Sequence, residues 1–123
     1  MEVIYVALGA AFGGVSRWVV NKLLLNYQDH FPFATLAVNI ISSFLVGVFI
    51  SIILLKQPEN QFIRPLLITG FCGGFSTMSS LSLESLQLFS QGRLFLGILN
   101  FVLNIILCLF ATWLGTICIK GAL

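Results

Sequence analysis

The sequence predicts an all-α integral membrane protein with four transmembrane helices. The first observation is composition: 59% of the 123 residues are hydrophobic and only 8% are charged, whereas soluble domains carry about 25% charged residues. The second is that four apolar runs, each long enough to cross a bilayer, follow one another along the chain. A soluble chain this short and apolar would lack the polar residues to cover its surface, so we reject a soluble helical bundle.

Four apolar runs define the predicted helices. They cover about residues 3–25, 33–55, 63–89 and 94–119. The second run follows Pro32, which blocks an earlier helix start, and contains no charge, so it is the clearest span. The polar connections between the runs are too short to hold a soluble domain. We therefore expect a single transmembrane domain over residues 1–123, with its function inside the membrane.

The basic residues give almost no orientation bias. Lys56, Arg64 and Lys120 would lie on one side of the membrane, and Lys22 and Arg93 on the other. Positive charge in the connections normally sets the orientation of a membrane protein. Three charges against two therefore permit insertion both ways round, or an orientation that a partner imposes.

The distribution of small residues favours association. Residues that let helices approach closely recur in the first two runs: Gly9, Gly13, Gly14, Ser42, Ser43 and Gly47. Four helices barely enclose a solute pathway, whereas an interface between two subunits can form one more easily. We therefore expect an oligomer, most simply an antiparallel dimer.

Three asparagines lie well inside the apolar runs, away from their ends, and polar groups inside hydrocarbon normally face protein or water. Asn39 stands in the second run, where its amide offers two donors and an acceptor without a charge. Asn100, Asn104 and Cys108 recur at every fourth position, which places them on one face of the fourth helix. Two interpretations stay open: these residues line a polar pathway, or they hydrogen-bond helices together.

Residues 70–82 of the third run contain three Gly and five Ser or Thr. Glycine weakens a helix and hydroxyl side chains offer the backbone other partners, so this composition predicts a broken helix. Non-helical backbone survives at membrane depth only where protein or a cavity satisfies it. The freed carbonyls can hold a cation, and the helix start that follows favours an anion. The alternative is an intact helix with a small-residue packing face.

Two charged residues, Arg17 and Glu84, lie well inside the predicted spans. Arg17 lies two-thirds along the first run, where its side chain can reach a watery vestibule and attract anions. A structural bond to a carbonyl or to Glu84 is the alternative. Two roles would explain why an acid such as Glu84 lies inside a span. It takes part in a proton relay, or it pairs with Arg17 or with a hydroxyl group. The sequence offers no Ser/His/Asp set, metal cluster or paired carboxylates, so we do not expect an enzyme.

Three segments together resemble the Fluc/CrcB family of fluoride channels over nearly the whole chain. Residues 13–18 read Gly-Gly-Val-Ser-Arg-Trp, similar to the family's Gly-Gly-x-x-Arg-aromatic element in the first helix. Residues 32–47 resemble its second-helix signature, except that Ala34 and Ser42 stand where the family usually has Gly. Residues 70–77 read Gly-Phe-Cys-Gly-Gly-Phe-Ser-Thr and resemble its third-helix break.

The resemblance implies a function and an assembly. Fluoride would move passively down its electrochemical gradient, and out of the cell when cytoplasmic fluoride is high. The family forms antiparallel dimers with two narrow anion pores and a structural sodium ion at the dimer interface. We therefore expect a multi-pass protein of the cell membrane, a bacterial inner or plasma membrane, with no organic cofactor and no nucleic-acid partner.

The resemblance also assigns roles to residues. The anion path would include Asn39, Thr77, Ser79, Ser80, Asn104, Cys108, Met78 and Leu81, with Arg17 at a vestibule and Glu84 and Asn100 as polar switch or structural groups. The backbone carbonyls of Gly73 and Ser76 match the family's sodium ligands. Asn104 and Cys108 fall where the family has hydroxyl residues, and Asn100 falls where it often has Tyr.

One departure concerns the anion path. After the break the family carries two Phe, three residues apart, whose positively polarised ring edges face the fluoride. Here Met78 and Leu81 hold those positions, while Phe71 and Phe75 lie in the wrong register. We favour a heterodimer whose paralogous partner keeps the Phe pair. This interpretation includes the case in which the present chain is a non-conducting or half-active subunit. A homodimer with altered pores is the alternative.

A small multidrug-type transporter is a further alternative, because it too is a short four-helix dimer of dual orientation. Such a transporter would need a central acid in its first helix to couple protons to a cationic drug. That helix has only Glu2 at its start and Arg17, whose charge has the wrong sign. The sequence therefore favours the fluoride channel.

Overall fold

The structure is a computed structural model that describes residues 2–27, 31–56 and 64–120. Its helices are α1 (Glu2–Leu23), the 3-10 helix η1 (Leu25–Tyr27), α2 (Phe33–Lys56), the π-helix η2 (Arg64–Cys72), α3 (Gly73–Phe75), α4 (Met78–Ser90) and α5 (Leu94–Lys120). The segment from η2 to α4 forms one interrupted span, which with α1, α2 and α5 gives four candidate membrane spans. The predicted all-helical architecture with four spans is confirmed.

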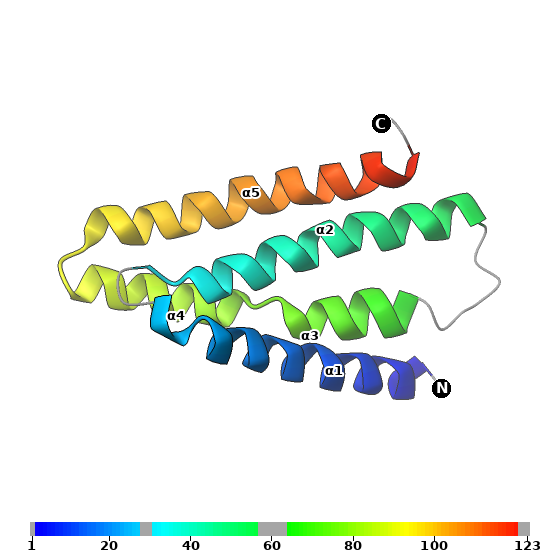
Figure 1. The fold of residues 1–123 in the computed structure, drawn as a ribbon, viewed down its shortest axis with the longest axis horizontal. Helices are drawn as coiled ribbons and strands as arrows, with labels where there is room; N and C mark the ends of the chain where they lie inside the picture. Colours follow the sequence, from blue (N-terminus) through cyan, green and yellow to red (C-terminus); the bar gives the residue numbers. More distant parts are fainter. Residues whose placement is uncertain (1, 28–30, 57–63, 121–123) are drawn as a thin grey trace.

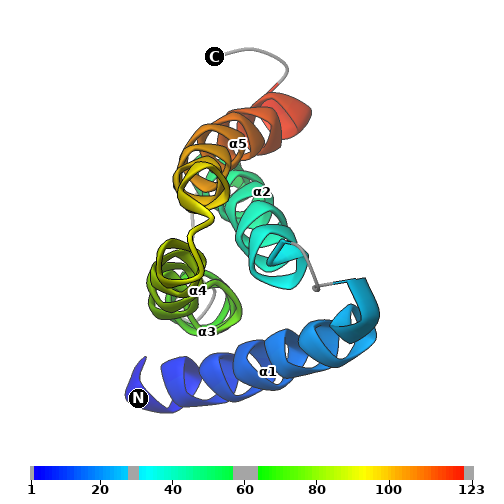
Figure 2. The ribbon, with the colours of Figure 1, turned by 90° about the vertical axis from the view of Figure 1, so that its left-hand side faces the viewer.

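The third span contacts all of the other long helices. α2 runs along α5, while α1 lies against η2 and α3 (Figure 1). α4 continues beyond the interruption and packs against the beginning of α5, which it reaches through a tight turn at Gly92 (φ 78°). In the end-on view, α1 crosses beneath the rest of the bundle (Figure 2).

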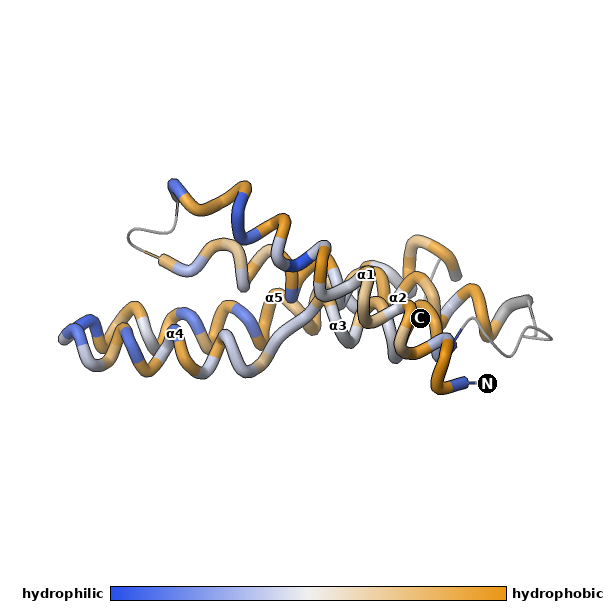
Figure 3. Tube along the Cα trace, turned by 90° about the horizontal axis from the view of Figure 1, so that it is seen from below, coloured by the Kyte–Doolittle hydropathy of each residue, from blue (hydrophilic) through white to orange (hydrophobic). Residues whose placement is uncertain are grey.

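Hydrophobic residues predominate along the helices (Figure 3), and many large hydrophobic side chains are exposed. On α1, for example, Val3, Phe12 and Trp18 are all exposed. Hydrophilic residues gather along α4 and toward the end of α1, where the Lys22 ammonium lies 5.4 Å from the centre of the Trp18 ring. Such a surface suits lipid acyl chains, and the Trp–Lys pair is typical of a helix end near the membrane–water interface.

Close backbone contacts explain several of the glycines. A Cβ atom at Gly9 would overlap the carbonyl oxygen of Leu66, so α1 and η2 approach closely because residue 9 has none. Gly47 and Gly115 allow the same approach between α2 and α5. A Cβ added at Gly14, in contrast, would meet no atom within 4 Å. Within the described residues, small residues set the helix spacing at Gly9 and Gly47 but not at Gly14.

The third span departs from a regular α-helix in two places. The nine-residue π-helix η2 was not predicted from the sequence; Pro65 near its start has no N–H to donate, and π-helical turns often occur at functional sites. The span then breaks at Ser76 and Thr77, whose backbones are extended (ψ 159° and ψ 118°). The break lies inside the Gly-rich and hydroxyl-rich segment that predicted it.

The variant Gly9→Ala should destabilise the protein, whereas Gly14→Ala should not. A methyl group at residue 9 overlaps the Leu66 carbonyl oxygen, and overpacking of this kind costs roughly 1–3 kcal/mol. At residue 14 the methyl group has open space and raises helix propensity. Thermal unfolding of both purified variants in detergent measures the difference, and equal unfolding temperatures would contradict the close contact.

Candidate functional site

The Asn39 side chain holds the broken third span. Its Oδ1 accepts a hydrogen bond from the Thr77 N–H (2.8 Å), and its Nδ2 donates to the Thr77 carbonyl oxygen (3.3 Å). Asn39 Nδ2 also donates to Asn104 Oδ1 (2.8 Å), so one amide joins α2, the break and α5. All three residues are buried. These bonds satisfy backbone groups that lipid could not satisfy.

The break releases two backbone carbonyls from helical hydrogen bonding. In a continuous helix the Thr77 N–H would bond to Gly73, and the Ser80 N–H would bond to the carbonyl of residue 76. Here the Thr77 N–H donates to Asn39. The Ser80 N–H donates to Thr77 Oγ1 (3.1 Å), which caps the start of α4. The carbonyls of Gly73 and Ser76, which were predicted as cation ligands, therefore lack these helical donors.

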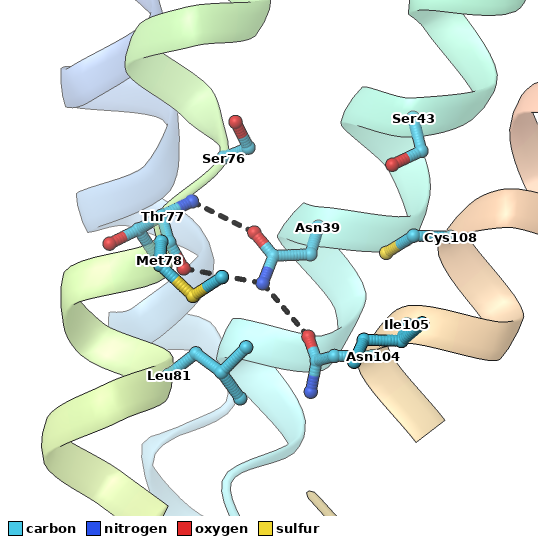
Figure 4. Close-up of a pocket in the computed structure, with 9 residues that line it drawn as sticks. All are labelled: Asn39, Ser43, Ser76, Thr77, Met78, Leu81, Asn104, Ile105 and Cys108. Atoms are coloured by element: carbon cyan, nitrogen blue, oxygen red, sulfur yellow. Dashed lines mark hydrogen bonds between the residues drawn. The ribbon is translucent and has the colours of Figure 1, made fainter. Parts of the chain in front are cut away.

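A pocket of about 280 Å³ adjoins the Asn39 bonds (Figure 4). It is lined by Asn39, Ser43, Ser76, Thr77, Met78, Leu81, Asn104, Ile105 and Cys108. Six of these residues belong to the predicted anion path, and they come from α2, the third span and α5. The fold thus brings most of that predicted set to one place.

Ser43 lines this pocket, although the sequence marked it only as a small packing residue. It follows Asn39 by four positions on α2, so the two side chains lie on the same helix face. The four-residue spacing that placed Asn104 and Cys108 on one helix face would also have identified Ser43 as a neighbour of Asn39. Ile105 also lines the pocket, and no feature of the sequence distinguishes it from its apolar neighbours.

Three of the predicted polar residues lie outside this lining. Asn100 has no exposed surface and donates to Ser85 Oγ on α4 (2.9 Å). Ser79 Oγ lies 3.2 Å from Thr77 Oγ1. Ser80 contributes its N–H to the helix cap. Ser79 and Ser80 therefore occupy the first turn of α4, beside the pocket rather than on its wall.

A second pocket, of about 190 Å³, shares residues with the first. It is lined by Ser42, Ser43, Val46, Ile68, Cys72, Gly73 and Ser76. The hydroxyls of Ser42 and Ser76 both donate to the Cys72 carbonyl oxygen, each over 2.9 Å. This second pocket thus contains both residues whose carbonyls the break releases.

The two charged residues predicted inside the spans do not line either pocket. Arg17 is half-buried on α1, where its carbonyl oxygen accepts from Asn21 Nδ2 (2.9 Å). Glu84 lies on α4 with the Thr35 hydroxyl within hydrogen-bonding reach, while its Oε1 has no partner among the described residues. In the described part of the chain, no ion pair joins Arg17 to Glu84.

Met78 and Leu81, which stand where the resemblance implies two Phe residues, both line the first pocket. Met78 is 65% exposed and Leu81 is 3% exposed. Phe71 and Phe75 stack on each other, with ring centroids 5.5 Å apart, and neither lines the pocket. Among the described residues, the pocket wall therefore contains a thioether and aliphatic groups but no aromatic ring edge.

Comparison with known proteins finds relatives over nearly the full length of the chain. Residues 4–116 match the family model described as CrcB-like protein, Camphor Resistance (CrcB). A Coxiella burnetii protein named fluoride-specific ion channel FluC is 40% identical over 119 residues, which cover 95% of this chain and 96% of that protein. Proteins of the same name from Ruminiclostridium cellulolyticum and Campylobacter lari are 38% and 39% identical, over 98% and 96% of this chain and 93% and 97% of their own lengths.

The variant Asn39→Leu should lower stability much more than Asn21→Leu. Without the Asn39 amide, the Thr77 N–H and carbonyl oxygen stay unpaired in a buried site, and each unpaired group costs about 1–3 kcal/mol. Asn21 is the matched control because its side chain bonds only to the Arg17 carbonyl of its own helix. Thermal unfolding in detergent compares the two, and equal losses would contradict the role of Asn39 at the break.

Proposed function

The chain belongs to the CrcB-like family, and we propose that it is a subunit of a fluoride-specific ion channel that lowers cytoplasmic fluoride. Relatives that cover nearly the whole chain carry the name of that channel. The structural observation that supports the proposal is the pocket beside the broken third span. There, amide and hydroxyl groups face a space within a protein of four candidate membrane spans.

The chemistry of the pocket suits a small anion. Fluoride holds its hydration water strongly, so a pore must replace that water with hydrogen-bond donors. Asn39, Asn104 and Thr77 line the pocket with residues that carry donor groups, and Ser43 adds a hydroxyl one turn from Asn39. Ser79 and Ser80 continue the series along α4. Several weak sites in succession allow an ion to enter and also to leave.

Other residues contribute at the edges of the proposed path. Cys108 presents a thiol, a weak donor, where the family has a hydroxyl. Arg17 has no carboxylate partner among the described residues, so its charge is available to attract anions to a vestibule. We assign Glu84 a structural role through Thr35, because that hydroxyl is the group within its reach.

A second subunit, packed antiparallel to the first, would complete the path. Met78 lies on the pocket wall and yet is 65% exposed, which suits a position covered by another chain. The nearly equal division of basic residues between the two sides permits opposite insertion of two copies. The fluoride path would then run between subunits rather than through one of them.

A structural sodium ion fits the residues of the second pocket. Gly73 and Ser76 both lie there, and the break diverts the N–H groups that would otherwise bond to their carbonyls. Carbonyl oxygens are suitable ligands for a hard cation of low charge. When bound, sodium would supply positive charge that offsets the repulsion of carbonyl dipoles meeting at the dimer interface.

A paralogous partner is the second candidate for the assembly, and Met78 and Leu81 favour it. They line the pocket at the positions where the family carries Phe, and neither offers a polarised ring edge. A partner that keeps the Phe pair would supply the edges that this chain lacks. The present chain would then be a half-active or non-conducting member of the pair.

Proteoliposomes that contain this chain alone should release fluoride and retain chloride, as followed with ion-selective electrodes, if the chain forms a working homodimer. Release only after a paralogue with the Phe pair is added would instead support the heterodimer. If folded protein releases no fluoride either alone or with such a partner, the proposed function is wrong.

The variant Asn39→Asp should reduce fluoride flux by at least about a hundredfold. A carboxylate about 4 Å from the ion opposes it by about 4 kcal/mol at an effective dielectric constant of 20, and each 1.4 kcal/mol is a factor of ten. Asn21→Asp adds the same charge on α1, outside the pocket, and should reduce flux far less. Unchanged flux in Asn39→Asp would remove Asn39 from the path.

A further inference from the structure

A directional chain of hydrogen bonds leads from the pocket to α4. Asn39 Nδ2 donates to Asn104 Oδ1 (2.8 Å), Asn104 Nδ2 donates to Asn100 Oδ1 (3.1 Å), and Asn100 Nδ2 donates to Ser85 Oγ (2.9 Å). Asn100 and Ser85 have no exposed surface, and Asn104 is 3% exposed. We call these four side chains the amide relay.

In this direction the relay presents an acceptor to the pocket. The Asn104 oxygen points toward Asn39, while its nitrogen points away and donates also to the Asn100 carbonyl oxygen at 2.7 Å (Figure 4). The Asn39 nitrogen is occupied as well, by Thr77 O and Asn104 Oδ1. An anion that enters the pocket therefore meets amide hydrogens that are already bonded, although the proposed function requires donors there.

The relay can reverse while Asn104, Asn100 and Ser85 stay hydrogen-bonded to one another. Half a turn of an Asn amide exchanges oxygen and nitrogen with little change in shape, and a serine hydroxyl both donates and accepts. After reversal, Ser85 donates to Asn100, Asn100 donates to Asn104, and the Asn104 N–H points into the pocket. The bond to the Asn100 carbonyl oxygen and the bond from Asn39 Nδ2 to Asn104 Oδ1 are both lost, and charge-assisted bonds from the freed Asn104 and Asn39 N–H groups to the anion replace them.

We propose that Asn100 and Ser85 are positioning residues that let Asn104 turn an N–H toward fluoride as the ion enters the pocket. The proposal rests on the channel function proposed above and describes how the same pocket changes from acceptor-lined to donor-lined. Asn100 is central because its side chain serves either direction, whereas its backbone carbonyl can only accept. Without a polar side chain at residue 100, reversal would place the Asn104 oxygen against that carbonyl oxygen.

The variants Asn100→Leu and Asn100→Ser distinguish a relay that must reverse from side chains that only pack the helices together. Leu has nearly the shape of Asn but leaves only the backbone carbonyl to hold Asn104, so the relay stays locked. Ser can donate or accept and keeps the relay reversible. Fluoride efflux from proteoliposomes should fall at least about tenfold for Asn100→Leu, the effect of one lost hydrogen bond to an ion. Flux should stay within about threefold of wild type for Asn100→Ser.

A second readout does not depend on flux. In protein labelled with ¹⁵N-asparagine, the Asn104 side-chain signal is identified by its absence from an Asn104→Ser sample. Fluoride, compared with chloride, should shift that signal in wild type and in Asn100→Ser but not in Asn100→Leu. If Leu at residue 100 prevents folding, Asn100→Ala provides the same lock.

Four outcomes would overturn the relay: normal flux in Asn100→Leu, equal losses of flux in both variants, a fluoride-dependent Asn104 signal in Asn100→Leu, or no such signal in wild type. Failure of the channel function is distinguishable from these. Wild-type protein that passes no fluoride, either alone or with a paralogous partner, but whose Asn104 signal responds as described, would contradict the channel and support the relay.

Discussion

The hydrogen bonds between the Asn39 amide and the Thr77 backbone are the interaction on which the rest of the site depends. A membrane span can be interrupted only if protein replaces the lost helical partners, and Asn39 does so for both backbone groups of Thr77. Because the Thr77 N–H is diverted to α2, the Gly73 carbonyl loses its helical donor and the Thr77 hydroxyl is placed to start α4. One amide therefore produces the pocket wall, the released carbonyls and the restarted helix together.

The amide groups that hold the protein together at the break would also have to bind the ion, and this limits how strongly the ion would be held. Each amide that faces the pocket is already bonded within the protein, so an entering anion would exchange one hydrogen bond for another instead of filling an unpaired donor. The net gain from such an exchange is small compared with the gross strength of either bond. A site of this kind would compensate for part of the lost hydration without trapping the ion, which passage through a pore requires.

The sequence predicted features that depend on local composition and missed those that depend on distant partners. The four spans follow from apolar length, and the break follows from the glycines and hydroxyls of residues 70–82. The bonding partner of Asn39 lies 38 residues away, beyond what periodicity can report. Asn100 shares a helix face with Asn104 and Cys108, yet α5 changes neighbours from α4 to α2 along its length, so Asn100 faces Ser85 and the other two face the pocket. The π-helix η2 has no compositional signature comparable to that of the break.

The interrupted span is also the least hydropathic of the four candidate spans, and this has a consequence for how the chain enters the membrane. Its extended backbone at Ser76 and Thr77 has no satisfactory state in lipid alone. α2, which is strongly apolar and emerges from the ribosome earlier, can insert by itself and bring Asn39 to membrane depth in advance. Biogenesis of the third span is therefore coupled to that of its predecessor, with α2 acting as an intramolecular template for the segment that follows it.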